Sequence, residues 1–287
     1  SAASDVYKRQ RRAGSLMAMC GIVGYVGDRA GLTVAVDALR RMEYRGYDSA
    51  GVAVADQGRV SVAKRAGKLA NLEDRIEEIG ADKLAGTTAI GHTRWATHGR
   101  PVDENAHPHL SYDGKVAIVH NGIIENFAAL RAELERDDVE LVSETASEVA
   151  AHLMAKAYNE GETAGDFEAS ALAVVNRLEG AFTLLFLHAD HPDRVVAARR
   201  STPLLVGVGD GEMFLGSDVA AFIEYTKEAV ELGQDNVVVI DRDGYRILNL
   251  DGTEATGRPF TIDWDLEAAE KGGYDSFMMK EINEQPA

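Results

Sequence analysis

Cysteine is the scarcest reactive residue in this 287-residue chain, which contains one, Cys20. A single cysteine excludes an internal disulfide framework and is typical of the reducing cytoplasm, where we expect the protein to act. Proline is also rare, with 6 residues against 28 glycines, which favours flexible turns over stiff linkers. No apolar run approaches the roughly 20 residues that a membrane helix requires. We therefore expect no association with a membrane.

Positive charge is in short supply as well. Lysine and arginine number 30 against 47 aspartates and glutamates, for a net charge of −17. Phosphate backbones repel such a chain, so general binding to nucleic acid is excluded. The remaining composition, 45% hydrophobic and 27% charged, is that of a globular protein and not of a disordered, collagenous or coiled-coil chain. At about 150 residues per domain, the length allows one large domain or two.

Residues 1–19 differ from the rest of the sequence. Four basic residues lie between positions 8 and 12, and no apolar periodicity accompanies them. A basic run before uncharged residues superficially resembles a signal peptide, but the uncharged part lacks a continuous apolar segment. We interpret 1–19 as an atypical leader outside the mature domain, with translation starting at Met17 or Met19.

The hydrophobic pattern after the leader predicts a mixture of helices and antiparallel strands. Apolar residues at helical spacing predict helices over 32–42, 69–79, 124–136, 147–159 and 165–179. Apolar runs predict strands over 20–27, 51–56, 59–65, 87–93 and 115–120. They predict further strands over 181–188, 193–199, 203–209, 212–217, 235–241 and 245–250. Asp-Gly pairs at 210–211, 243–244 and 251–252 predict turns between them. Short turns between adjacent strands favour antiparallel sheets.

Cys20 allows two interpretations. A lone cysteine is most often a small buried thiol. It is also able to act as a nucleophile when it is the first residue of a processed chain. A free α-amine has a pKa of about 7.7–8.0, so near neutral pH it is able to serve as the base toward its own thiol.

Two polar clusters follow strands. Residues 91–99 contain Arg94, whose guanidinium suits a carboxylate, next to Trp95, Thr97 and His98. The alternative for this segment is a solvated loop with a half-buried tryptophan. Residues 120–122 (HNG) offer an asparagine amide beside a glycine N–H, which together are able to stabilise an oxyanion. The alternative here is an ordinary Asn-Gly turn.

Five of the eight histidines lie between positions 92 and 120. They are His92, His98, His107, His109 and His120. No cysteine or carboxylate occurs near them at familiar metal-ligand spacing, so we expect neither a metal site nor any other cofactor.

Five ordered motifs together resemble a known family. They are residues 19–24 (MCGIVG), 43–51 (EYRGYDSAG), 92–99 (HTRWATHG), 105–109 (NAHPH) and 120–126 (HNGIIEN). They resemble the N-terminal glutaminase domain of the glutamine–fructose-6-phosphate aminotransferase (isomerizing) family, a branch of the class II glutamine amidotransferases. The first motif alone would fit any class II member, whereas the second and third point to this branch.

The resemblance implies an α+β fold, a four-layer αββα N-terminal-nucleophile (Ntn) hydrolase sandwich of two antiparallel sheets. It implies a glutaminase domain over 20–250 and a connector over 251–287 toward a sugar-phosphate isomerase domain that is absent from this chain. In the full-length enzyme that domain uses ammonia from L-glutamine to convert fructose 6-phosphate to glucosamine 6-phosphate for amino-sugar biosynthesis. A homodimer through that missing domain is expected.

The resemblance also implies roles for individual residues. Cys20 would attack the glutamine side-chain amide, with its own α-amine shuttling the proton. Asn121 and the Gly122 amide would hold the oxyanion. Arg94 would bind the substrate α-carboxylate. Further residues would line the substrate pocket: Trp95, Thr97, His98 and Gly122.

Two departures from the family pattern leave an alternative open. The leader blocks the α-amine of Cys20 that the mechanism needs. Ala146 stands where the family carries an aspartate that pairs with the α-ammonium of glutamine, although Glu144 or Glu148 is near enough in sequence to replace it. The alternative is therefore a catalytically impaired glutamine-binding or assembly module.

Overall fold

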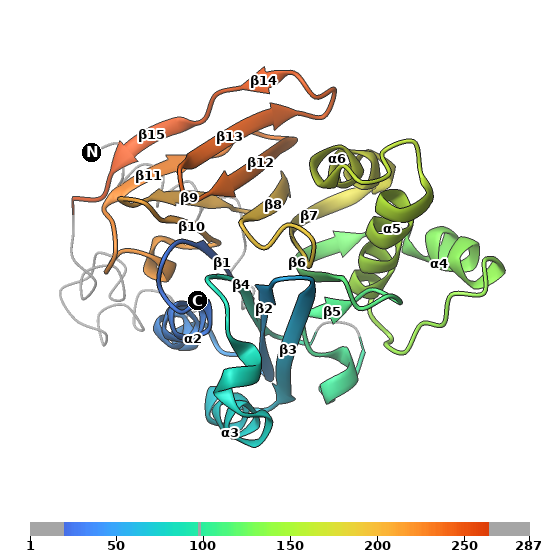
Figure 1. The fold of residues 1–287 in the computed structure, drawn as a ribbon, viewed down its shortest axis with the longest axis horizontal. Helices are drawn as coiled ribbons and strands as arrows, with labels where there is room; N and C mark the ends of the chain where they lie inside the picture. The colour runs from blue at the N-terminus through green and yellow to red at the C-terminus, as the bar shows by residue number, and fades with distance from the viewer. Residues whose placement is uncertain (1–19, 97–98, 264–287) are drawn as a thin grey trace, which may run out of the picture.

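The computed structural model describes residues 20–96 and 99–263. In this part of the chain, one sheet of eight strands has the order β15-β11-β9-β10-β1-β4-β2-β3, and a second of seven has the order β14-β13-β12-β8-β7-β6-β5. Neighbouring strands in both sheets pair antiparallel. Figure 1 shows helices α2 and α3 beside the first sheet and helices α4, α5 and α6 beside the second.

The elements have the following bounds. The helices are α2 (Gly31–Arg41), α3 (Leu69–Ile79), α4 (Phe127–Arg136), α5 (Ala146–Glu160) and α6 (Phe167–Arg177), with short 3-10 helices η1 (Glu43–Arg45), η2 (Ala81–Leu84), η3 (Asp103–Asn105) and η4 (Val219–Ala221). The first sheet contains β1 (Gly21–Val26), β2 (Ser49–Asp56), β3 (Arg59–Ala66), β4 (Thr88–Arg94), β9 (Leu205–Val208), β10 (Met213–Gly216), β11 (Glu228–Glu231) and β15 (Arg258–Thr261). The second contains β5 (His109–Leu110), β6 (Val116–Ile124), β7 (Gly180–His188), β8 (Arg194–Arg200), β12 (Asn236–Asp241), β13 (Gly244–Asn249) and β14 (Glu254–Ala255).

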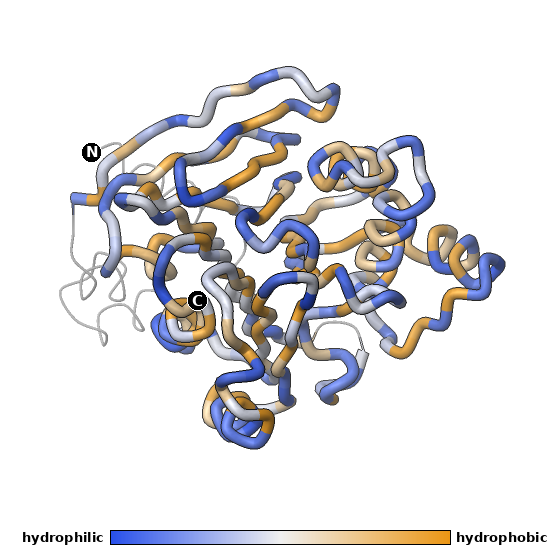
Figure 2. The backbone as a smooth tube through the Cα atoms, viewed as in Figure 1, coloured by the Kyte–Doolittle hydropathy of each residue, from blue (hydrophilic) through white to orange (hydrophobic). Residues whose placement is uncertain are grey.

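Three hydrophobic cores separate the layers. Successive side chains of a strand point to opposite faces, so β7 places Phe186 in the core under α4, α5 and α6 and Leu185 in the core between the sheets. In the same way, β1 places Ile22 between the sheets and Val23 in the core under α2 and α3. Apolar residues accordingly run along the strands in Figure 2. These cores define the layers α, β, β, α, which confirms the predicted Ntn-type sandwich.

Most predicted elements are present, and α3 has the predicted bounds. One local prediction is wrong: strand β6 continues through Asn121 and Gly122 to Ile124, and α4 begins only at Phe127. The reason is that Asn121 pairs with Thr183 and Gly122 with Phe182 on β7, so the strand has a partner along its whole length. The interpretation of 121–122 as an Asn-Gly turn is therefore wrong.

The two sheets also continue beyond residue 250, where we expected the glutaminase domain to end. Strand β14 pairs with β13, and β15 pairs with β11. Strands β14 and β15 are short and carry charged residues, and β11, the partner of β15, contains a glutamate at each end. For this reason the hydrophobic pattern did not indicate these three strands. The leader 1–19 and positions 264–287 of the expected connector lie outside the described residues. No helix in the described ranges is long and apolar enough to cross a membrane.

Candidate active site

Cys20 lies immediately before β1, a central strand of the first sheet. The backbone N–H groups that follow it are held by side chains of the same layer. Gly21 N–H donates to Thr93 Oγ1 at 2.9 Å, and Ile22 N–H donates to Ser217 Oγ at 3.1 Å. A Cβ on Gly21 would lie 2.7 Å from Thr93 Oγ1. This close packing fixes the backbone that carries the thiol.

The thiol of Cys20 accepts a hydrogen bond from the Trp95 backbone N–H at 3.1 Å. Burial raises the pKa of the Cys20 thiol, and the Trp95 N–H together with the nearby Arg94 guanidinium opposes that rise. A raised pKa keeps the sulfur protonated at neutral pH, so the group needs a base to act as a nucleophile.

Asn121 meets Cys20 from the opposite sheet. Its Nδ2 donates to the Cys20 carbonyl oxygen at 2.8 Å, which joins β6 of the second sheet to the start of β1. The next residue, Gly122, has a φ of 109°, and a Cβ there would lie 2.1 Å from the Ala181 carbonyl oxygen. Only glycine fits this position. The structure thus brings Asn121 into contact with Cys20, and Gly122 follows Asn121 directly in the chain.

Arg94 ends β4 and is 5% exposed. Its guanidinium donates to the Gly99 and Arg100 carbonyl oxygens, each at 3.4 Å. Burial lowers the pKa of Arg94 from its ordinary value of 12.5, but an arginine stays charged in proteins. Trp95 follows it with 45% of its surface exposed. The other two residues predicted for this loop, Thr97 and His98, lie outside the described residues.

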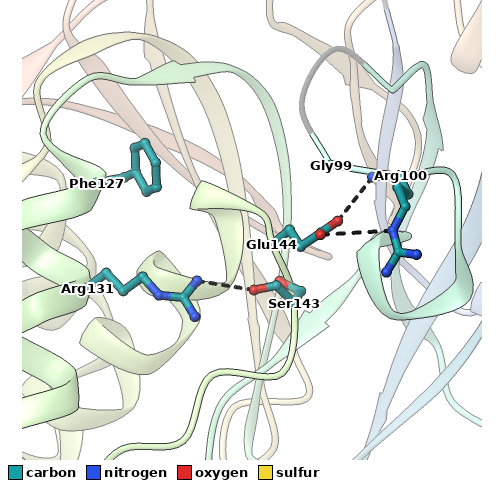
Figure 3. Close-up of a pocket in the computed structure, with 6 residues that line it drawn as sticks. All are labelled: Gly99, Arg100, Phe127, Arg131, Ser143 and Glu144. Carbon is teal, nitrogen blue, oxygen red and sulfur yellow. Dashed lines mark hydrogen bonds and ion pairs between the residues drawn. The ribbon is translucent and has the colours of Figure 1, made fainter.

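A cavity of about 590 Å³ lies beside this loop. It is lined by Gly99, Arg100, Phe127, Arg131, Ser143 and Glu144. Figure 3 shows Phe127 and Arg131 on one side, Gly99 and Arg100 on the other, and Glu144 between them. Arg94 donates to the carbonyl oxygens of both Gly99 and Arg100, so the cavity borders the predicted substrate loop. Sequence reasoning missed Phe127 and Arg131 because helical spacing marks them only as ordinary positions of α4.

Ala146 stands where the family pattern has an aspartate, and Glu144 and Glu148 are the nearby candidates to replace its charge. These three residues have different surroundings. Ala146 opens α5 and packs against the core under the helices. Glu148 is buried, and its carboxylate accepts hydrogen bonds from the Val142 N–H at 2.8 Å and from the Ser143 N–H and Oγ at 2.7 Å. Burial alone would raise the pKa of Glu148, but hydrogen bonds from His152, Ser143 and Val142 lower it to about 2.

The Glu148 carboxylate therefore binds the segment before α5. Glu144 instead lines the cavity, where its Oε2 accepts from the Arg100 N–H at 3.1 Å and from Asn105 Nδ2 at 2.8 Å. Of the two glutamates, Glu144 is the one whose carboxylate faces a space large enough for a ligand.

Four of the clustered histidines form one buried group behind Asn121. These are His92, His107, His109 and His120. Ser147 Oγ lies 2.8 Å from both His107 Nε2 and His120 Nδ1. Burial lowers the pKa of His92 to about 4 and that of His120 to about 3. In the described part of the chain, no three or more His, Cys, Asp or Glu side chains are arranged to hold a metal ion.

Comparisons with known proteins agree with this geometry. The glutamine amidotransferase domain family matches residues 92–224. Glutamine–fructose-6-phosphate aminotransferase [isomerizing] of Mycobacterium tuberculosis is 65% identical over 274 residues, covering 94% of this chain and 44% of the relative. The Streptomyces coelicolor protein of the same name is 59% identical over 268 residues, covering 93% of this chain and 43% of the relative. The chain thus spans less than half the length of these relatives.

Among solved structures, a glutamine phosphoribosylpyrophosphate amidotransferase from B. subtilis has a TM-score of 0.67 at 22% identity, covering 82% of this chain and 50% of that one. At this identity the likeness shows the fold alone. The fold, the matched domain and the aminotransferase relatives agree with one another. The chain therefore belongs to the class II glutamine amidotransferases, as a domain of the kind that glutamine–fructose-6-phosphate aminotransferases carry.

Proposed function

We propose that this chain hydrolyses L-glutamine to glutamate and ammonia, with Cys20 as the nucleophile. The observation that carries the proposal is the meeting of two strands from different sheets. The Asn121 amide, on β6, lies 2.8 Å from the carbonyl oxygen of Cys20, at the start of β1. A nucleophilic thiol and a fixed amide donor are the two groups that acyl transfer from an amide requires.

The proposed reaction has two halves. In a chain that begins at Cys20, the α-amine takes the thiol proton while Sγ attacks the side-chain carbonyl carbon of glutamine. The Asn121 amide and the Gly122 N–H stabilise the negative oxygen of the tetrahedral intermediate. The C–N bond breaks, and the amine returns the proton to the departing ammonia. Water then attacks the γ-glutamyl thioester, which releases glutamate and restores the thiol.

Arg94 is the proposed partner of the substrate α-carboxylate. Its charge is buried near Cys20, and a buried guanidinium gains most from a planar anion that accepts two hydrogen bonds. Trp95, Thr97, His98 and Gly122 are proposed to line the rest of the pocket. Specificity for glutamine over asparagine would follow from the fixed separation between Arg94 and the Asn121 amide.

The wider role is a proposal by analogy with relatives named glutamine–fructose-6-phosphate aminotransferase. We propose that ammonia made here serves an isomerase domain beyond this chain, which converts fructose 6-phosphate to glucosamine 6-phosphate for amino-sugar biosynthesis in the cytoplasm. The connector to that domain would follow β15. The full-length protein would form a homodimer through the isomerase domain.

Covalent labelling tests the proposal. A glutamine analogue with an electrophilic diazoketone in place of the side-chain amide should alkylate Cys20 in the chain that begins there. Peptide mapping by mass spectrometry should locate the label, and excess glutamine should slow labelling, whereas asparagine should not. Labelling at another residue, or no protection by glutamine, would contradict the proposal.

The alternative of a catalytically impaired glutamine-binding or assembly module rests on Ala146, which offers no charge to the substrate ammonium, and on the leader, which blocks the α-amine of Cys20. Such a module would be labelled and protected by glutamine yet would release no ammonia. Measuring ammonia on the same sample separates the two functions.

A further inference from the structure

His92 contacts Asn121 from the side away from Cys20. It lies on β4 and is 1% exposed. Its Nε2 is 2.9 Å from Asn121 Oδ1, while Asn121 Nδ2 is 2.8 Å from the Cys20 carbonyl oxygen. The side-chain amide of Asn121 is thus held at both ends, by His92 on β4 and by the carbonyl of Cys20 just before the neighbouring strand β1.

The chemistry of these contacts fixes the protons. The Cys20 carbonyl only accepts, so the Asn121 atom facing it must be the NH₂ group, and the atom facing His92 must be the oxygen. That oxygen also only accepts, so His92 must donate from Nε2. Burial lowers the pKa of His92 to about 4, so at neutral pH the ring has a single N–H, which this contact assigns to Nε2.

Asn121 Nδ2 carries two protons, and the Cys20 carbonyl receives one of them. The second remains for a ligand oxygen. We infer that His92 is a positioning residue, which holds the Asn121 amide so that this second N–H is directed at the oxyanion before substrate arrives. The inference rests on the proposed function, because it assigns His92 a role through the oxyanion donor of that reaction.

The surroundings of His92 hold its ring in place. The His107 ring packs against it with centroids 4.3 Å apart and ring planes inclined by 33°, and His107 is itself within hydrogen-bond distance of Ser147. A rotation of the His92 ring would displace this packed neighbour. Because an oxyanion donor contributes most when it needs no reorientation during the reaction, such rigidity is what the role requires.

A double-mutant cycle tests whether His92 acts through Asn121. We expect Asn121→Ala to lower kcat for glutamine by about 10²–10³-fold, as for loss of one oxyanion donor. His92→Phe should lower kcat by about 10-fold or more, but by no more than Asn121→Ala does, with little change in KM. Added to Asn121→Ala, it should cause no further loss, because the group that it positions is already gone.

Two variants keep the test valid if His92→Phe fails to fold. His92→Gln places an amide N–H close to the Nε2 position and should retain kcat within about 3-fold, whereas His92→Asn is equally polar but too short to reach. His109→Phe is the matched control, because His109 is buried in the same group and contacts Thr145 instead of Asn121. It should leave kcat near the wild-type value.

The outcomes separate cleanly. Full additivity of His92→Phe and Asn121→Ala, or equal kcat for His92→Gln and His92→Asn, would overturn the positioning role while leaving the proposed function intact. Absence of ammonia release from the wild-type protein would overturn the proposed function, and the positioning role with it. A loss of kcat confined to variants that cannot donate to Asn121 would support both.

Discussion

Gly122 lies so close to Ala181 on the neighbouring strand that a Cβ at position 122 would sit 2.1 Å from the Ala181 carbonyl oxygen. The contact involves backbone on both sides, so no side-chain movement is able to relieve it. It forces glycine at the proposed oxyanion donor and fixes that N–H relative to β7.

Gly122→Ala should therefore lower both activity and stability. The strand would have to move, which would displace the Gly122 N–H and lower kcat by about 10²-fold or more. The positive φ adds about 1–2 kcal/mol of conformational strain. Gly114→Ala is the matched control, because Gly114 has a φ of 70° but nothing within 4 Å of a Cβ. A Gly122→Ala protein with the kcat and unfolding midpoint of Gly114→Ala would show that the contact has no role.

The leader should control activity. A chain that retains residues 1–19 should fold but release no ammonia, because the Cys20 nitrogen is then an amide without a basic lone pair. A chain that begins at Cys20 should be active. Intact-mass measurement must verify the N-terminus of each sample, and circular dichroism must show that both are folded. Equal activity with the leader confirmed in place would show that the α-amine is not the base.

Ala146→Asp should strengthen glutamine binding. Loss of a charged partner in a desolvated site costs about 2–5 kcal/mol, and solvent filling the space of a missing side chain favours the low end. Roughly 2–3 kcal/mol corresponds to a KM lowered about 30- to 150-fold by the substitution, with little change in kcat. Steady-state titration of glutamine measures this. Equal KM values would mean that another group already supplies the charge.

If Ala146→Asp leaves KM unchanged, Glu144 is the residue to examine as the source of the charge, because it lines the cavity. Glu144→Gln keeps the size and removes the charge, so it should then raise KM. Glu148 is unsuitable as a first choice, because its carboxylate holds the backbone before α5.

Stability should fall on mild acidification. Burial holds the pKa of His92 at about 4 and that of His120 at about 3, below the ordinary value near 6.5. Between pH 6.5 and pH 4 the unfolded chain therefore binds protons that the folded chain excludes. Each such histidine lowers the free energy of unfolding by up to about 1.4 kcal/mol per pH unit in this window.

Urea unfolding at pH 7, 6 and 5 measures the effect. Glu148 does not interfere, because its pKa of about 2 affects stability only below the ordinary range of glutamate, near 4.3. His120→Gln should reduce the dependence on pH. Identical unfolding midpoints at pH 7 and pH 5 would contradict the neutral, buried state of this group.

The long helices and antiparallel strands could be predicted because each of them carries its own pattern, whereas their arrangement in four layers followed from the resemblance to a known family. Strand β7 alternates between two cores, and α3 has apolar residues at helical spacing. The strands that were missed, such as β11 and β15, are short, and their pairing depends on partners distant in sequence. A hydrophobic pattern records burial, and β11 and the edge strand β15 each contain only one or two buried residues beside exposed or partly exposed ones.

Some residues of the candidate site could be predicted from the sequence, and some of its contacts could not. Cys20, Arg94 and Asn121 could be proposed as candidates from the chemistry of their side chains, and the resemblance to a known family supplied their roles. The His92–Asn121 contact could not, because it joins β4 to β6 across the interface between the sheets. The sequence left open that Gly122 belongs to an Asn-Gly turn. Its pairing with Phe182 shows that it lies within a strand.

Ammonia release from glutamine by the chain that begins at Cys20, compared with its Cys20→Ala and Cys20→Ser variants, tests the central claim most directly. Cys20→Ala should release none, and Cys20→Ser nearly none, because the hydroxyl is the weaker nucleophile. The parent chain should act on glutamine and leave asparagine unchanged. Ammonia release by Cys20→Ala at the parent rate would remove Cys20 from the reaction and contradict the account.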